Sequence, residues 1–318
     1  MRRFIPLLAT FLVLIVLFAM ASVLYERFFS ARVIANLFAN KYAYLGIAAI
    51  GMTFVIISGG IDLSVGAVLA FTVTLVASLI ADYSWHPLTA IALALLVGTC
   101  FGAGMGVLIQ RYELPPFLVT LAGMFFARGL AFVVSAESIT IDHEFYTAVQ
   151  EVKFTVGPKA KLKIGSVIFL AVLGVAVFVA HGTPFGRNIY AMGGNESSAR
   201  LMGLPVARTK IMVYALNGFC AALAGVVATL FMPSGNPAAA VGLELDVIAA
   251  VVIGGTLLTG GVGYVAGTLG GVLIFGTIET ALDFDGRLSS SWLRITISVL
   301  LLMFILLQRQ LSRFTRKT

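Results

Sequence analysis

Ionisable side chains inside the apolar stretches are few, and they are the first residues of this chain that could do chemistry. They are Asp62, Arg128 and Glu279, with Asp283 near the end of an apolar stretch. A charge in hydrocarbon costs at least ~2.5 to 3.5 kcal/mol on insertion scales, so each should face protein, water or an opposite charge. Arg128 and Glu279 are therefore candidates for an ion pair, either as a lock between two helices or with a role in transport.

Asp62 lies in a glycine-rich interruption of an apolar run, residues 59–66. Its neighbours Gly59 and Ser64 are typical of a turn and a helix cap rather than of a proton relay. A second interruption, residues 254–261, is weakly similar to the first. Paired interruptions in the two halves of a transporter indicate discontinuous helices near a substrate route.

Such a route suits a neutral, hydroxyl-rich solute, because the apolar stretches contain so little charge. A solute of that kind is bound by hydroxyl, amide and aromatic groups rather than by carboxylates. The residues predicted to lie along the route are Thr53, Ser58, Gly59, Gly60, Asp62, Phe125, Asn217, Gly254, Gly255 and Thr256. The same side chains could also serve as interhelical hydrogen bonds or as core packing.

Motifs of catalysis are missing from the chain. No Gly-Lys dipeptide occurs, which excludes a phosphate-binding loop of the Walker type, and the three histidines lack the spacing of a His-Glu-x-x-His metal site. Cys100 and Cys220 sit within apolar runs, where a free thiol packs as a small hydrophobe. We predict no enzymatic activity, no disulfide, no metal site and no cofactor bound by this chain.

The elements that position these residues must be transmembrane helices. Of the 318 residues, 60% are hydrophobic and 11% are charged, and the mean hydropathy is +1.04. Soluble domains carry about 25% charged residues, so a water-soluble cytosolic or secreted protein is excluded. The runs are continuous rather than alternating, which also excludes the strands of a membrane β-barrel.

Hydropathy predicts an all-α fold: a polytopic membrane helical bundle of about ten transmembrane helices, some of them discontinuous, in a single domain over residues 1–318. The predicted spans are 4–25, 43–58, 63–81, 88–109, 117–135, 164–181, 211–231, 247–258, 264–281 and 293–308. Glycines recur every four residues in the fourth and ninth spans, which predicts close packing of two central helices. No segment is long or polar enough for a separate nucleotide-binding domain.

Lys and Arg are more frequent at both ends of the chain and in the loop 182–210, which places these parts in the cytoplasm and the loop 136–163 outside. The net charge of +7 then reflects topology, and we expect no nucleic-acid partner. The first span imitates a signal peptide, with Ala19-Met20-Ala21 as its cleavage site. Because the apolar run continues to Tyr25, we expect this helix to stay uncleaved.

The inner loop 182–210 contains a short predicted helix, residues 196–202. Asn195 is a good N-cap, and Gly203 is a natural stop signal. A helix this short must pack on something. Ala199 and Met202 share one face, which suits insertion into a groove of a partner; the alternative is a linker helix lying on the membrane.

Three segments, residues 51–66, 193–203 and 244–255, make the chain resemble the permease subunits of ribose-type ATP-binding-cassette (ABC) sugar importers over nearly its whole length. The resemblance implies a cytoplasmic ATPase that uses ATP, a second homologous permease, identical or different, and a periplasmic sugar-binding protein. It also implies a multi-pass protein of the bacterial inner membrane. The residues that would couple the permease to the ATPase are Asn195, Glu196, Ser197, Ser198, Ala199, Arg200, Leu201, Met202 and Gly203.

Two further segments, residues 121–129 and 283–290, are similar to a permease of galactofuranose importers. That closer likeness implies import of a monosaccharide from periplasm to cytoplasm, galactofuranose or otherwise ribose or a related sugar. Two other classes remain open on the residues alone. They are an ion-coupled secondary transporter of a small neutral solute, for which Glu279 is the one good buried carboxylate, and an integral membrane enzyme, for which no catalytic cluster is present.

Overall fold

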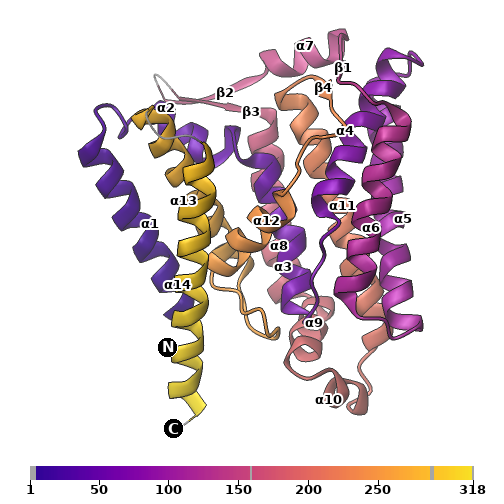
Figure 1. The fold of residues 1–318 in the computed structure, drawn as a ribbon, viewed down its shortest axis with the longest axis vertical. Helices are drawn as coiled ribbons and strands as arrows, with labels where there is room; N and C mark the ends of the chain where they lie inside the picture. Colours follow the sequence, from indigo (N-terminus) through magenta and orange to yellow (C-terminus); the bar gives the residue numbers. More distant parts are fainter. Residues whose placement is uncertain (1–4, 158–159, 287–289, 317–318) are drawn as a thin grey trace.

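The computed structural model describes residues 5–157, 160–286 and 290–316, which form a mostly helical protein (Figure 1). Its helices are α1 (Ile5–Leu24), α2 (Ala31–Ala35), the π-helix η2 (Asn36–Asn40), α3 (Ala43–Ile57), α4 (Val65–Ala81), α5 (Pro87–Arg111), α6 (Pro116–Val134), α7 (Glu144–Glu151), α8 (Ile164–Gly182), α9 (Pro184–Gly194), α10 (Glu196–Leu201), α11 (Val206–Phe231), α12 (Leu243–Ile253), α13 (Val265–Asp285) and α14 (Ser290–Arg316). Its strands are β1 (Ile139–Thr140), β2 (Lys153–Gly157), β3 (Ala160–Lys163) and β4 (Ser234–Gly235).

Every predicted span coincides with a helix, but the helices differ in length. In the described residues six of them, α1, α5, α6, α8, α11 and α13, are long and apolar enough to cross a membrane. The helices α3, α4 and the apolar part of α14 are shorter, and α12 has 11 residues. Six of the ten predicted spans therefore meet the length for a crossing, and the short helices α3, α4 and α12 flank interruptions of the chain.

Two small antiparallel sheets correct the all-α prediction. The strands β1 and β4 pair Ile139 with Gly235, and β2 and β3 pair Lys153 with Lys163. Both sheets lie with α7 at one end of the molecule, outside the bundle of long helices (Figure 1). Hydropathy detects the apolar spans, whereas these short polar strands are held by backbone pairing that leaves no such signal.

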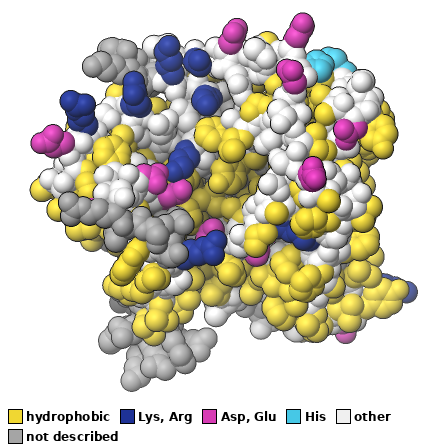
Figure 2. Space-filling model, turned by 45° about the horizontal axis from the view of Figure 1, so that its top comes forward, with side chains coloured by type: hydrophobic (Ala, Val, Ile, Leu, Met, Phe, Trp, Pro, Cys, Tyr) yellow, Lys and Arg dark blue, Asp and Glu magenta, His cyan; other side chains and the backbone are white. Residues whose placement is uncertain are grey.

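The bundle has two different ends (Figure 1). At one end lie α9 and α10, together with the start of α1 and the end of α14. The loop 136–163, with α7 and three of the strands, lies at the opposite end. The loops predicted to face opposite sides of the membrane are thus at opposite ends. Figure 2 shows charged side chains gathered around the end with α7, while hydrophobic side chains cover much of the flank below.

The predicted glycine packing of the fourth span is present, although its helix is not central. A Cβ on Gly98 would meet Ala222, and one on Gly102 would overlap the backbone of Tyr214, so α5 lies tightly against α11. However, α5 lies at an edge of the bundle, beside α6 (Figure 1). Its other face carries exposed side chains such as Leu96. Small residues mark a close helix contact, and such a contact does not require burial on all sides.

In the C-terminal half, glycines bring α13 against α12. A Cβ on Gly271 would overlap the carbonyl oxygen of Ala250, and one on Gly267 would overlap that of Gly254. The helix α1 packs beside α13, and the Thr10 hydroxyl donates a 2.6 Å hydrogen bond to the carbonyl oxygen of Ile253. These contacts position the end of α12, where the second interruption begins.

Candidate functional site

The first interruption begins with a glycine cap at the end of α3. The Gly59 and Gly60 amides donate hydrogen bonds of 3.0 Å to the carbonyl oxygens of Ile56 and Val55, respectively. Gly59 has φ of 86°, a left-handed conformation that glycine adopts without steric cost. This is the Schellman arrangement that closes many helices.

The second interruption repeats that cap at the end of α12. The Gly255 amide donates a 2.9 Å hydrogen bond to the carbonyl oxygen of Val252, and the Thr256 amide donates one of 3.2 Å to that of Val251. Gly255 has φ of 92°. The weak sequence similarity between the two interruptions therefore corresponds to one shared backbone geometry. In both, a short apolar helix stops and a non-helical segment leads to the next helix; the second segment also contains a turn, closed by a 3.0 Å hydrogen bond from the Leu257 amide to the carbonyl oxygen of Val262.

The two interruptions meet each other and α9. The Gly261 amide donates a 2.8 Å hydrogen bond to the carbonyl oxygen of Ile57. A Cβ on Gly193 of α9 would overlap that same Ile57 oxygen, and one on Gly260 would lie 2.9 Å from the Cα of Gly59. Backbone thus touches backbone among three segments, which leaves no room for side chains.

Asp62 is held in a buried network just before α4. Its carboxylate accepts hydrogen bonds from the Ser64 amide at 2.8 Å, the Ser64 hydroxyl at 2.6 Å and the Asn217 side-chain amide at 2.8 Å. Asp62 is 1% exposed. These contacts stabilise the predicted turn that leads into α4 and tie it to α11. Ser64 is the N-cap residue of α4, but its hydroxyl donates to Asp62 and makes no cap hydrogen bond to that helix.

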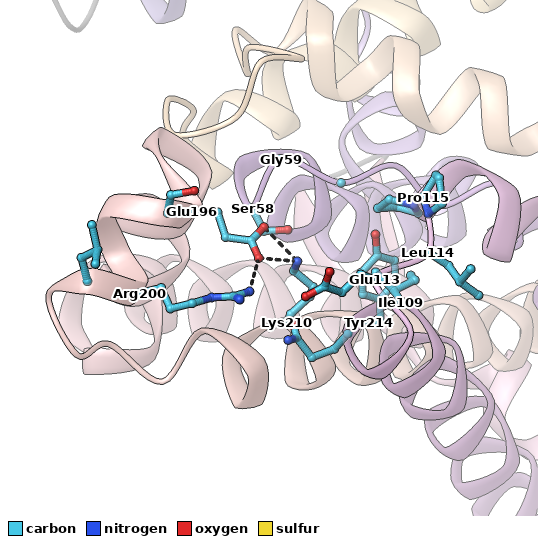
Figure 3. A pocket seen from close by; sticks show the side chains of 15 residues that line it. Ser58, Gly59, Ile109, Glu113, Leu114, Pro115, Glu196, Arg200, Lys210 and Tyr214 are labelled. Atoms are coloured by element: carbon cyan, nitrogen blue, oxygen red, sulfur yellow. Dashed lines mark hydrogen bonds and ion pairs between the residues drawn. The ribbon is translucent and has the colours of Figure 1, made fainter.

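A polar cavity lies beside this network, at the end of the molecule that carries α10 (Figure 3). Its volume is about 740 Å³. Four parts of the chain surround it: the end of α3, the turn between α5 and α6, the helix α10, and the first turns of α11. The lining residues are Ser58, Gly59, Gly60, Ile109, Gln110, Glu113, Leu114, Pro115, Pro116, Glu196, Ser197, Arg200, Leu201, Lys210 and Tyr214.

Two buried polar atoms of this lining lack a hydrogen-bond partner in the structure. They are the Tyr214 hydroxyl, which lies against Gly60, and the side-chain oxygen of Gln110. Tyr214 is 1% exposed. In addition, Glu113 has φ of 52° in the α5–α6 turn, a conformation that is costly for a residue with a side chain.

The helix α10 has the predicted cap and stop. The Asn195 side chain accepts a 2.7 Å hydrogen bond from the Ser198 amide, and Gly203 has φ of 77°. The helix runs over Glu196–Leu201, so the predicted end at Met202 is one residue too late. The chain then turns back at once into α11.

An ion pair ties α10 to α11. Lys210 donates to both carboxylate oxygens of Glu196, at 2.8 and 2.9 Å, and Arg200 contacts the same carboxylate at 3.2 Å (Figure 3). The Lys210 side chain is 16% exposed and that of Glu196 is 38% exposed. Partial burial makes this contact stronger than a typical surface pair.

The prediction that Ala199 and Met202 together form the face of α10 that inserts into a partner is wrong. Ala199 is fully buried against this chain's own Met192 and Val206, whereas Met202 is exposed. The adjacent Leu201 is 89% exposed. The helix needs one face to pack on α9 and α11, and the small side chain of Ala199 permits that close approach. The exposed face is therefore formed by Leu201 and Met202.

The predicted ion pair between Arg128 and Glu279 is also wrong. Arg128 donates to the carbonyl oxygens of Pro237 and Ala239, at 2.8 and 2.6 Å. The non-helical segment before α12 leaves these oxygens free to accept, because they take no part in a helix ladder.

Glu279 instead pairs with Lys41, at 3.1 Å, and Lys41 also contacts Asp283 at 2.9 Å. Burial opposes the charge on Lys41, but the two carboxylates outweigh it and raise the pKa of Lys41. This cluster lies at the end of α13 that is opposite to α10. It joins that end to the turn before α3.

Most of the predicted route residues are buried or line the cavity, whereas one lies apart. Ser58, Gly59 and Gly60 line the cavity. The remaining buried ones are Thr53, Asp62, Asn217, Gly254, Gly255 and Thr256. The Thr53 hydroxyl lies 2.7 Å from that of Thr268, a contact between α3 and α13. Phe125 is 67% exposed on α6, away from this group.

The sequence-based prediction missed eight lining residues of the cavity, and four of these eight are polar or charged: Gln110, Glu113, Lys210 and Tyr214. Lys210 and Tyr214 share one face of α11, one helical turn apart, but nothing in the sequence shows that this face meets α10 and the end of α3. Only the packing of α11 against these elements places them in one site.

The described residues contain no group of three or more His, Cys, Asp or Glu side chains that could hold a metal ion. Both cysteines are free thiols. Cys220 is buried, and Cys100 is exposed on the outer flank of α5. The site thus offers hydroxyl, amide and carboxylate groups around a polar cavity, with interrupted helices behind it.

Comparison with known proteins decides the family. Residues 34–307 match the family described as branched-chain amino acid transport system / permease component. The chain belongs to this family of ABC permeases. It is 47% identical to the inner membrane ABC transporter permease protein YjfF of Escherichia coli, over 98% of this chain and 94% of that protein. No solved structure was found to match.

Other relatives are named for sugar import. This permease is 38% identical to the fructose import permease protein FruG of Bifidobacterium longum, over 97% of this chain and 92% of that protein. It is 40% identical to the ribose import permease protein RbsC of Bacillus subtilis, over 96% and 93% of the two chains. The chain is thus a multi-pass inner membrane permease component of a sugar ABC importer.

Proposed function

We propose that this permease carries a monosaccharide from the periplasm to the cytoplasm, unmodified, while a separate cytoplasmic ATPase hydrolyses ATP. The observation that carries the proposal is the meeting of two identically capped helix interruptions with α9, next to α10. A movement of α9 and α10 would be transmitted directly to both interruptions, because backbone touches backbone there. A second homologous permease and a periplasmic sugar-binding protein complete the transporter.

The part that contacts the ATPase is the segment from Asn195 to Gly203. In support, Leu201 and Met202 expose apolar side chains at the end of the molecule that carries both α10 and the chain termini. Exposed apolar side chains on a short, internally tethered helix fit a groove on a partner protein. We therefore place both ends of the chain, and α10, in the cytoplasm.

The sugar that we propose is galactofuranose. The support is the similarity of residues 121–129 and 283–290 to a galactofuranose importer permease. The chemistry of the interruptions favours a neutral solute, because Asp62 is already bound by Ser64 and Asn217. Relatives named for fructose and ribose import make these sugars the next to test.

The sugar-binding protein would dock at the end that carries α7 and β1 to β3. Figure 2 shows Lys and Arg side chains gathered on one side of this end, with Asp and Glu side chains both among them and over the other side, so the cations are unevenly divided over it. A surface divided in this way can orient a partner of complementary charge and raise its rate of association. Docking there would place the sugar carried by the binding protein over the helical bundle.

Uptake into proteoliposomes tests the function. Vesicles would hold the assembled complex, with ATP inside and labelled galactofuranose plus binding protein outside. We expect accumulation of unmodified sugar that requires ATP. Accumulation driven by a proton or sodium gradient without ATP would instead identify a secondary transporter, and a chemically altered sugar would identify an enzyme.

A variant tests the role of α10. Because Gly203 has a left-handed backbone, Gly203→Val should misplace the end of α10, at a cost of about 1 kcal/mol or more. No atom lies within 4 Å of a Cβ at this position, so the strain is confined to the backbone. Sugar uptake and sugar-stimulated ATP hydrolysis should fall together. Normal stimulation in this variant would show that α10 does not couple the two subunits.

A further inference from the structure

The polar cavity beside α10 has features of a ligand site that the translocation route alone does not explain. The Tyr214 hydroxyl and the Gln110 side-chain oxygen are buried and lack partners within the structure. An unsatisfied buried polar group costs about 1–3 kcal/mol, so both atoms favour a bound molecule that donates and accepts hydrogen bonds. Both side chains line the same cavity.

The lining selects a neutral, hydroxyl-rich molecule. The lining carries two cations, Lys210 and Arg200, and two carboxylates, Glu113 and Glu196, so its formal net charge is zero. Both cations are paired with Glu196, and an inorganic anion would have to compete with that carboxylate. A hydroxyl-bearing ligand could use the phenol, the amide oxygen and the Ser58 hydroxyl, whose own hydrogen goes to Val55. It leaves all existing bonds in place.

Apolar side chains complete the match to a sugar. Ile109, Leu114 and Pro115 line the cavity beside the polar groups, and such surfaces pack against the C–H faces of a sugar ring. The volume of about 740 Å³ falls within the range of about 300–1,000 Å³ that is usual for small-molecule sites. The other large described cavities, between α5 and α6 and between α1 and α13, have almost wholly apolar linings.

The position of the cavity allows a bound sugar to act on coupling. The lining joins α10 to the α5–α6 turn, where Glu113 holds a strained backbone conformation. It also includes Gly59 and Gly60, the cap of the first interruption. A ligand that bridges these parts would oppose their relative movement, since it binds one arrangement better than any other.

From these observations we propose that the cavity is a cytoplasmic site for the imported monosaccharide, and that sugar bound there slows further import. The site is reached at the α5–α6 turn, where Glu113 and Leu114 are exposed at its rim, outside the segment proposed to contact the ATPase. The identity of the ligand rests on the proposed function, whereas the presence of a site for a neutral polyol rests on the cavity itself.

The test uses proteoliposomes with the assembled complex, ATP inside, and labelled galactofuranose with binding protein outside. Unlabelled galactofuranose is enclosed at increasing concentration, and initial uptake and ATP hydrolysis are measured. We expect both rates of the unaltered complex to fall as internal sugar rises. Each rate is divided by the rate of the same protein without internal sugar, so that a general loss of activity does not affect the result.

Two substitutions locate the effect. Tyr214→Phe keeps the ring and removes the hydroxyl, and Gln110→Leu removes the amide oxygen. Each should raise the internal sugar concentration for half inhibition roughly three- to tenfold, the loss of about one hydrogen bond. Thr99→Val, on the same helix as Gln110 but bonded to its own Leu95 carbonyl, is the matched control and should leave that concentration unchanged.

A direct measurement complements the inhibition. The detergent-purified complex, without binding protein, should bind labelled galactofuranose saturably, and Tyr214→Phe should weaken this binding by the same factor. The inference is overturned if internal sugar leaves ATP-driven uptake unchanged. It is also overturned if both variant complexes show the same internal sugar concentration for half inhibition as the unaltered complex. If no sugar is taken up with ATP at all, the proposed function itself fails, and saturable binding of the sugar then still reports on the cavity.

Discussion

The hydrogen bond between Asn217 and Asp62 should contribute more to the free energy of unfolding than most single contacts in the membrane part of this permease. It joins α11 to the turn before α4 over 2.8 Å, and Asp62 is 1% exposed. A hydrogen bond to a charged group contributes about 1.5–3 kcal/mol. In Asn217→Ala, one carboxylate oxygen loses its donor where water does not reach. We therefore expect a loss of about 2 to 3 kcal/mol in the free energy of unfolding.

Asp62→Asn should be milder, at about 1 kcal/mol. The new amide oxygen can still accept from the Ser64 amide and hydroxyl, as the carboxylate does. The Asn217 side-chain oxygen has no partner, so rotation of that amide would let it accept from the new amide nitrogen. Because Asp62 serves as a hydrogen-bond acceptor in the turn before α4 and not as a proton relay, this variant should also retain ATP-driven uptake.

Thermal unfolding of the complex in lipid nanodiscs provides the assay. At roughly 2 °C per kcal/mol, Asn217→Ala should lower Tm by about 4 °C or more. The double variant should lose less than the sum of the single ones, with a coupling of about 1–2 kcal/mol. Thr74→Val removes an equally buried hydroxyl that bonds only to its own helix, and it should cost less than 1 kcal/mol. A Tm for Asn217→Ala that matches this control, or strict additivity, would refute the reasoning.

Three other contacts predict outcomes of single substitutions. Gly193→Ala should abolish uptake and reduce expression, because the new Cβ would overlap the carbonyl oxygen of Ile57. Gly104→Ala is the control and should leave uptake and expression unchanged, because no atom lies within 4 Å of a Cβ at that position. Equal effects of the two variants would show that the Gly193 contact is unimportant. Lys210→Met should lower sugar-stimulated ATP hydrolysis two- to fivefold, about 0.5–1 kcal/mol, without loss of folded protein, because it frees Glu196 of α10; full stimulation would count against the tether. Cysteines introduced at Ser198 and Thr155 should be labelled from opposite sides of intact cells, the former only from the cytoplasm, and labelling of both from outside would contradict the topology.

A cysteine introduced at Thr318 extends the same labelling experiment to the C-terminus. This residue lies outside the described residues. Its labelling from the cytoplasm would support the placement of the C-terminus that the basic residues predict. The end of α14 lies at the same end of the bundle as α10 (Figure 1), in agreement with that prediction.

Local sequence alone determined the long apolar helices of this protein, but not its short strands. Long apolar runs predict helices because every backbone polar group in a membrane must be paired within the segment. The cap of α10 could be predicted from Asn195 and Gly203, since both act on groups two or three residues away. The two interruptions are recognisable for the same reason: a left-handed glycine ends a helix through bonds to its own last turn.

Tertiary structure decided which of these elements meet, and so which side chains form the site. Arg128 contacts carbonyl oxygens of a non-helical segment more than 100 residues away, and no pattern of charge spacing distinguishes these oxygens from a carboxylate partner. Lys210 and Tyr214 enter the cavity because glycines allow α5 and α11 to approach closely and because the Glu196–Lys210 ion pair holds α10 against α11. Sequence periodicity reports on the faces of one helix, whereas a site between helices depends on how those faces are paired, and that choice is made by close packing over the whole bundle.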